Sequence, residues 1–181
     1  MSGRTPREAV ESFLEPLKAV LRCITAEGFV TRYSRRGDEH LTAAFQDRFA
    51  VLDRRSGEPL RLELRHRFAA MRAPVERGPW VASTVEYVYQ VFDEYDDMIA
   101  AWHWHPVTAQ PGDQARWPHL HAYGARDTLT LHKLHLPTGR VSIEAVVRFL
   151  IQDLEVLPRR PDWERVLDQH EETFRRERSW A

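Results

Sequence analysis

The sequence predicts an α+β fold: an N-terminal helix, an antiparallel β-meander of about five to seven strands, and two C-terminal helices. Apolar residues recur at helical spacing from Val10 to Ile24, change to a period of two from Phe29, and return to helical spacing after Gly139. The links between the expected strands are short and contain no long helix. Antiparallel pairing is therefore favoured over a parallel sheet.

The first helix has a clear start signal. Thr5 suits the N-cap, Pro6 the first helical position, and Glu8 the third position of a capping box. Pro16 interrupts the apolar pattern and is expected to kink the helix or split it in two. Gly28 is the expected stop.

The middle of the chain alternates apolar and polar residues in short runs separated by turn residues. The clearest turns are Gly37-Asp38, residues 56–59 and residues 93–97. We expect strands over Phe29–Arg36, Leu41–Asp53, Leu60–Phe68, Val81–Phe92, Met98–His105 and Leu129–His135.

Two helices are expected after the strands. Ser142 is a suitable N-cap for an apolar stripe that runs from Ile143 to Leu154. Pro158 to Pro161 forms a stiff break, and Asp162 is expected to start the last helix. We expect residues 1–181 to form one domain, with 1–137 as helix plus sheet and 138–181 as the helical pair.

Composition excludes several classes of protein. The 181 residues are 43% hydrophobic, which is enough for a buried core and argues against disorder. No apolar run reaches the ~18–20 residues of a membrane span, and the N-terminus has no apolar signal core, so no membrane association is expected. One cysteine, Cys23, fits a reducing cytoplasm. A net charge of −1 excludes a globally basic nucleic-acid binder, though not a local basic patch.

Charge is unevenly distributed along the expected strands. Residues 29–78 hold eleven arginines against seven acidic residues, a net charge of +4, whereas residues 79–115 hold six acidic residues and no Lys or Arg. These stretches are interpreted either as solvated strand faces or as a basic surface for phosphates or an acidic partner.

Histidines are clustered: six of the nine lie between residues 103 and 135. His103 and His105 are two apart, as are His119 and His121, so each pair shares one face of a strand. If the two segments pair antiparallel, the four imidazoles converge.

Three kinds of chemistry suit such a quartet. It could bind a zinc-type divalent metal, supply a general acid and base for RNA cleavage, or stack with neighbouring tryptophans on single-stranded bases. The alternative is that the rings are half-buried strand residues bonded to their neighbours. With no motif for a bound cofactor, the cofactor is either none or such a metal.

Arginines on the earlier strands and tryptophans beside the first histidine pair complete the candidate site. Arginine binds phosphate through two parallel hydrogen bonds and stabilises developing negative charge. Salt bridging across the strands is the competing interpretation. The candidate substrate-binding residues are Arg32, Arg35, Arg65, Trp102 and Trp104.

The segment from about residue 81 to 123 resembles the TumE-like toxins of bacterial toxin–antitoxin modules. The resemblance is carried by Tyr87-x-Tyr89, Ile99-x-x-Trp102 with its histidine-rich continuation, and the Pro118 to His121 ending. It implies a growth-inhibiting protein that acts on RNA or translation and is neutralised by a small helix-turn-helix antitoxin. The chain is longer than that family leads one to expect, and its two C-terminal helices have no counterpart there.

Three hypotheses follow from the sequence. The first is a cytoplasmic toxin-like protein that acts on RNA through the histidine cluster, as a ribonuclease-type hydrolase would. The second is a small metal-binding hydrolase. The third is a non-enzymatic module that binds another protein through its C-terminal helices or its sheet edge.

Overall fold

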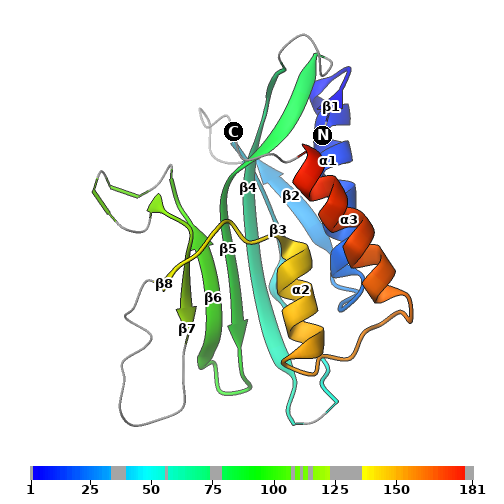
Figure 1. The fold of residues 1–181 in the computed structure, drawn as a ribbon, viewed down its shortest axis with the longest axis vertical. Coiled ribbons are helices and arrows are strands. Elements are labelled where there is room, and N and C mark those ends of the chain that lie inside the picture. Colours follow the sequence, from blue (N-terminus) through cyan, green and yellow to red (C-terminus); the bar gives the residue numbers. More distant parts are fainter. Residues whose placement is uncertain are drawn as a thin grey trace.

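A computed structural model shows three helices packed on one side of a strongly twisted antiparallel sheet (Figure 1). The predicted α+β fold is confirmed. The structure describes residues 2–33, 40–55, 57–73, 79–106, 109–110, 112–113, 116–122 and 136–177. Arg35 and the expected strand Leu129–His135 lie outside these residues.

Helix α1 spans Pro6–Leu21 and begins as the sequence predicts. The Glu8 backbone N–H donates to Oγ1 of Thr5 at 3.1 Å, which caps the first turn. Pro16 does not split the helix, which continues through this residue, and its ring is buried. The expected end near Gly28 was wrong, because the helix ends at Leu21.

The apolar pattern outlasts the helix because the turn that follows is itself buried. Cys23 is 0% exposed and Ile24 3% exposed, although neither is helical. Burial also raises the pKa of the Cys23 thiol, which matches a structural rather than a nucleophilic role.

The sheet is an antiparallel meander in which strands β2 to β8 follow one another in sequence order. Short β1 (Ser2–Gly3) pairs separately with the start of β5. The other strands are β2 (Phe29–Tyr33), β3 (His40–Leu52), β4 (Leu60–Arg72), β5 (Trp80–Phe92), β6 (Met98–Trp104), β7 (His119–Ala122) and β8 (Leu136–Pro137).

Strand β3 carries an irregularity that matters for the surface of the sheet. Its register against β4 shifts between Ala44 and Phe49. Within the shifted stretch Arg48 has φ +72°, a left-handed conformation that is uncommon for a residue with a side chain. Such a bulge bends the strand and changes the direction of a side chain.

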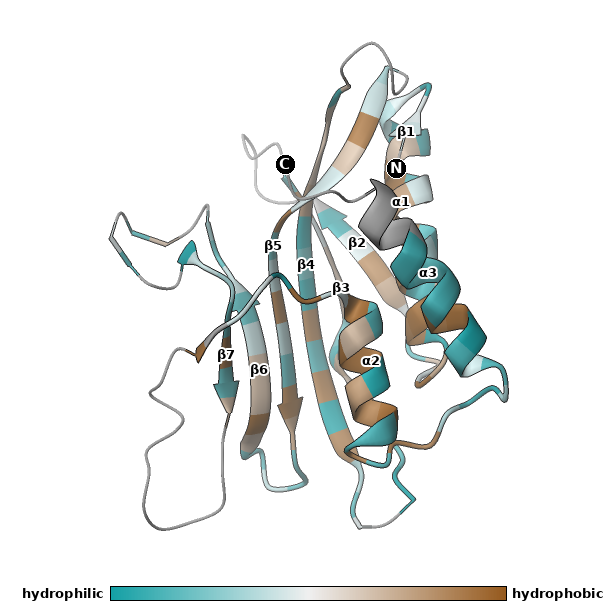
Figure 2. Cartoon of the chain, viewed as in Figure 1, coloured by the Kyte–Doolittle hydropathy of each residue, from teal (hydrophilic) through white to brown (hydrophobic). Residues whose placement is uncertain are grey.

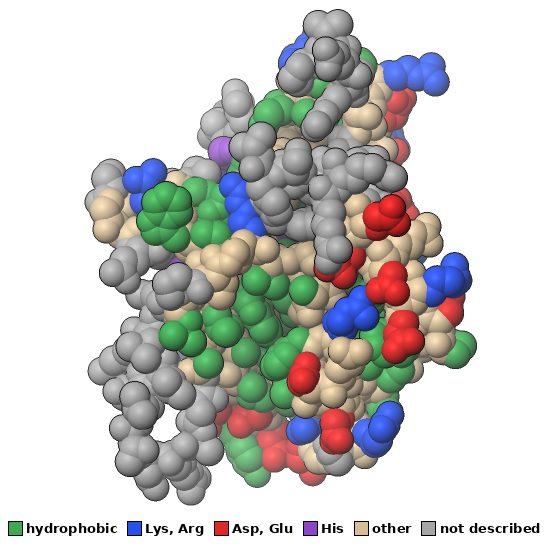
Figure 3. Space-filling model, in the orientation of Figure 1, with side chains coloured by type: hydrophobic (Ala, Val, Ile, Leu, Met, Phe, Trp, Pro, Cys, Tyr) green, Lys and Arg blue, Asp and Glu red, His purple; other side chains and the backbone are tan. Residues whose placement is uncertain are grey.

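Two helices follow the sheet as predicted. Helix α2 spans Ile143–Gln152, and its first turn is capped by Oγ of Ser142, which accepts from the Ala145 N–H at 3.1 Å. Helix α3 spans Trp163–Glu177. Charged side chains of both signs gather over α3 (Figure 3). Among the described residues, no helix is long and apolar enough to cross a membrane.

The hydrophobic core lies between the helices and one face of the sheet. Hydrophobic and hydrophilic residues alternate along β4 and β5 (Figure 2), and the apolar set faces the helices. At its centre the ring of Phe13 in α1 stacks on Phe68 of β4, with centroids 5.0 Å apart. Tyr87 and Tyr89 of β5 stack at 4.8 Å and are almost fully buried, as a packed aromatic ladder requires.

The hydroxyl of Tyr87 links the sheet to the chain before α2. It accepts a hydrogen bond from the Val141 N–H at 2.9 Å. Burial raises the pKa of Tyr87 to about 12, with this hydrogen bond and the Arg140 charge opposing the rise.

Tyr87 is therefore expected to make the protein less stable at high pH. The folded pKa of about 12 exceeds the value of about 10 of an unfolded tyrosine, so the folded state holds the proton more tightly. This contribution, about 2–3 kcal/mol, is complete below pH 10 and is lost as pH rises from 10 to 12. Urea unfolding at a series of pH values measures it. Tyr87→Phe should show a shallower decline, and equal slopes in the two proteins would contradict the assignment.

Candidate functional site: a histidine cluster on the sheet

The strand β6 divides its side chains between the two faces of the sheet. Trp102 and Trp104 point to the helices and are buried, and the ring of Trp102 contacts Phe149 of α2 at 5.5 Å between centroids. Because side chains alternate along a strand, His103 points to the opposite side, and His105 lies beside it. This side is called the histidine face below.

Pairing of β6 with β7 brings the second histidine pair to the same place. His103 lies directly across from His119, and Ala101 lies across from His121. The ring centroids of His103, His119 and His121 are separated by 4.9 to 5.5 Å. His105 lies 5.3 Å from His103 and 6.5 Å from His119. The structure therefore brings together the four imidazoles that the spacing suggested.

Three of the four rings are arranged so that they can share one ligand. His103, His119 and His121 each offer a ring nitrogen, and the three nitrogens lie within 4.8 Å of one another. Zinc binds imidazole nitrogens at ~2.0–2.1 Å, so atoms around one ion lie a few ångströms apart. The three nitrogens fit a metal ion after small side-chain rotations, and His105 stands next to this group.

Hydrogen bonds from outside the cluster hold two of the rings. Nδ1 of His119 lies 2.8 Å from the carbonyl oxygen of Trp117. Because a carbonyl only accepts, Nδ1 is the protonated nitrogen, and the lone pair of His119 is on Nε2. The side-chain amide of Gln90 lies 3.3 Å from Nε2 of His103. Metal-binding histidines are usually oriented by such partners.

The cluster disfavours positive charge on His103 and on His105. Burial lowers the pKa of His103 to about 3, and the neighbouring His105, His121, His119 and then Arg65 lower it further. Burial also lowers the pKa of His105, against an opposing effect of Glu86. At neutral pH these rings are neutral, which is the form that binds metal.

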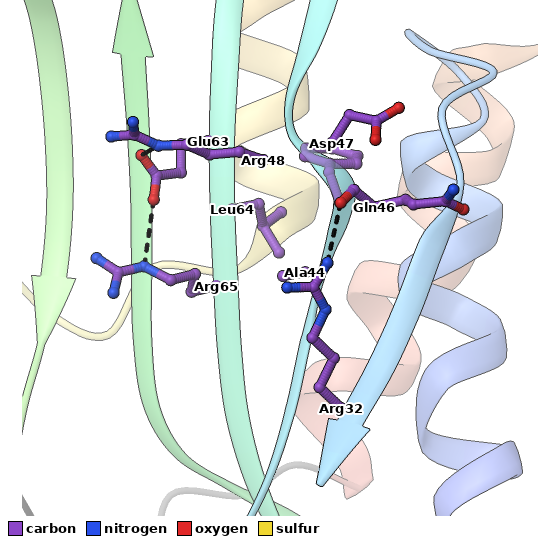
Figure 4. A pocket seen from close by; sticks show the side chains of 9 residues that line it. Arg32, Ala44, Gln46, Asp47, Arg48, Glu63, Leu64 and Arg65 are labelled. Atoms are coloured by element: carbon purple, nitrogen blue, oxygen red, sulfur yellow. Dashed lines mark hydrogen bonds and ion pairs between the residues drawn. The ribbon is translucent and has the colours of Figure 1, made fainter. Parts of the chain in front are cut away.

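The predicted substrate-binding arginines Arg32 and Arg65 lie at different places on the sheet. Arg65 lies on the histidine face, because it pairs across the sheet with Val88, which pairs with His103. Arg32 lies over β3 and donates to the carbonyl of Gln46 at 2.9 Å, apart from Arg65 (Figure 4).

The two tryptophans lie where they cannot contact a ligand on the histidine face. Trp102 is 8% exposed and Trp104 7% exposed, both in the core on the helix side. Arg140 places its guanidinium over the Trp104 ring at 3.7 Å. Neither residue can therefore stack on a ligand bound at the histidine face, although the sequence suggested this role. Trp117, which is 72% exposed, lies two residues from His119 instead.

Several neighbours of the cluster were not singled out from the sequence. Gln90 could have been predicted from the sequence. It lies two residues after Val88, which pairs with His103, so Gln90 is on the same face of the sheet as His103. Arg48 could not, because its direction depends on the β3 bulge. Together with Glu63 and Arg65 it lines a pocket of about 240 Å³ beside that bulge (Figure 4).

No protein-family model matches the chain, and no curated protein or solved structure matches it. What this site does must therefore be argued from its own geometry.

Proposed function

We propose that His103, His119 and His121 bind one divalent ion of the zinc class and that the protein is a metal-dependent hydrolase. The observation that carries the proposal is the convergence of three ring nitrogens within 4.8 Å of one another. Their positions follow from the pairing of β6 with β7. The site is therefore fixed by the sheet and does not depend on a loop.

The donor set suits such an ion. Imidazole is a preferred ligand of zinc, and three protein ligands are typical of catalytic zinc sites, in which one position stays open. When bound, such an ion would supply Lewis acidity that activates water for attack at neutral pH. The protein supplies a neutral His103 ring and the orientation of His119 by the Trp117 carbonyl.

Metal-free acid–base catalysis by the same histidines is less well supported. A general acid must carry a proton at the working pH, and an effective one has a pKa near that pH. Burial lowers the pKa of His103 to about 3 and also lowers that of His105. His103 and His105 are thus poor proton donors at pH 7, while the neutral His103 remains a good metal ligand.

Action on RNA is compatible with the metal site. The TumE-like resemblance implies such a substrate, and Arg65 lies on the same face as His103. In this hypothesis the proposed ion and the arginine would act on one phosphodiester. A toxin-like role and a helix-turn-helix antitoxin remain proposals that rest on the resemblance alone.

Metal analysis of tag-free protein tests the proposed function. Wild type is expected to bind about one zinc or manganese ion per chain, and His121→Ala to lose it. His170→Ala in α3 is the matched control, because that histidine belongs to the helical layer and should leave the metal content unchanged. Equal metal content in wild type and His121→Ala would refute the site.

If the ion is catalytic, hydrolysis of phosphate or carboxylic esters should stop on chelation and return with the metal. Activity that persists in metal-free protein would refute the proposed mechanism.

A further inference from the structure

A buried carboxylate on the histidine face holds two exposed guanidinium groups. Glu63 of β4 is 7% exposed. Its Oε2 accepts from Nε of Arg48 at 3.2 Å, and its Oε1 lies 3.4 Å from Nε of Arg65 (Figure 4). The side chains of Arg48 and Arg65 are 67% and 56% exposed. Both contacts are made by Nε, and the terminal nitrogens of each guanidinium extend toward β5 (Figure 4).

The charge of this group is positive. Two guanidinium ions share one carboxylate, which leaves a net charge of +1 on a solvated surface. Arginine binds phosphate oxygens through parallel hydrogen bonds, and a fixed guanidinium loses little conformational freedom when it does so. Glu63 therefore orients two phosphate-binding groups without neutralising them.

The bulge in β3 is what brings Arg48 to this position. Arg48 adopts φ +72°, a left-handed conformation that is strained for a residue other than glycine. Its guanidinium also lies 4.5 Å from the centroid of the Phe49 ring, which limits its directions. An Arg in this conformation reaches across β4 to Glu63.

The two arginines face the histidine cluster. Arg65 pairs with Val88 and Val88 with His103, so two strand spacings, about 10 Å, separate the backbones of Arg65 and His103. The side chains of Arg48 and Arg65 both extend toward β5, which lies between them and the histidines (Figure 4). The charge of Arg65 contributes to lowering the pKa of both His103 and His105, which agrees with this proximity.

We propose that Arg48 and Arg65, positioned by Glu63, bind a phosphate group of the substrate beside the histidine site. The substrate class of the hydrolase is then a phosphate ester. The substrate class rests on the proposed function, whereas the phosphate site itself does not require the metal.

Binding of pyrophosphate to metal-free protein tests the proposal. Isothermal titration at low ionic strength is expected to show binding to wild type, weakened at least tenfold in Arg48→Ala and Arg65→Ala. Arg165→Ala is the matched control, because Arg165 is the same residue type but lies on α3, where its side chain is 70% exposed and pairs with Asp162. Its affinity should equal that of wild type. Circular dichroism and metal content of the variants show whether each has kept its fold.

A single-stranded RNA decamer, followed by fluorescence anisotropy, identifies the source of the phosphate. Parallel losses of RNA and pyrophosphate binding in Arg65→Ala indicate a polynucleotide substrate, and a loss of pyrophosphate binding alone indicates a small phosphate ester. Undetectable pyrophosphate binding to wild type, or equal binding to wild type and both variants, overturns the proposal. Metal content of the same proteins, measured before the metal is removed, then shows whether the hydrolase proposal still stands.

Discussion

Zinc is expected to raise the free energy of unfolding of the metal-free protein by up to about 4 kcal/mol when free zinc is a thousandfold above its dissociation constant. The gain arises because the folded sheet presents His103, His119 and His121 together, whereas the unfolded chain does not. Binding of zinc to scattered histidines of the unfolded chain reduces the gain, so this value is an upper limit. Urea unfolding with and without zinc measures it.

His119→Ala is expected to remove most of this zinc-dependent gain. His119 is 3% exposed, so the substitution also lowers stability without metal. Only the difference between the two zinc conditions within each variant is therefore compared. His170→Ala should keep the full gain. If zinc stabilises His119→Ala as much as wild type, the metal is bound elsewhere.

Phe13→Ala is expected to destabilise the protein by about 3–5 kcal/mol, the usual cost of removing a fully buried aromatic ring. Phe13 is 0% exposed and contacts both Phe68, at 5.0 Å, and His66, at 5.5 Å between ring centroids. The substitution removes the ring contacts of α1 with Phe68 and His66 of β4 and leaves a cavity there. The loss is measured as the difference in unfolding free energy by urea denaturation.

Glu11→Ala on the exposed side of the same helix provides the control. Its carboxylate pairs with Arg7 in a surface contact at 2.8 Å, so its loss should change stability by less than about 0.5 kcal/mol. A loss below 1 kcal/mol in Phe13→Ala would show that the helix is held mainly by other contacts.

The sequence predicts the long elements of this fold because their periodicity is visible over many residues. Helix starts at Thr5 and Ser142 were predicted correctly, since capping depends on the side chain at one position. The end of α1 was not, because the buried turn with Cys23 and Ile24 continues the apolar spacing. The two-residue strands β1 and β8 are too short to show a period at all.

The histidine cluster was predictable in part. Parity along a strand placed His103 with His105 and His119 with His121, and short connection suggested that the segments pair. Parity also places Trp102 and Trp104 on the other side, which separates them from the histidines. The proposed phosphate-binding position of Arg48 could not be predicted from the sequence. The direction of its side chain depends on a local change of register in β3, and no residue pattern indicates that change.

The strict alternation along β6 makes the histidine site a reporter of correct folding. A shift of one residue in its pairing would turn the imidazoles into the apolar core and the tryptophans into water. Such a misfolded chain would lose core packing and metal ligands in the same event. The emission of Trp102 and Trp104 should therefore be blue-shifted only in molecules that have also assembled the histidine face.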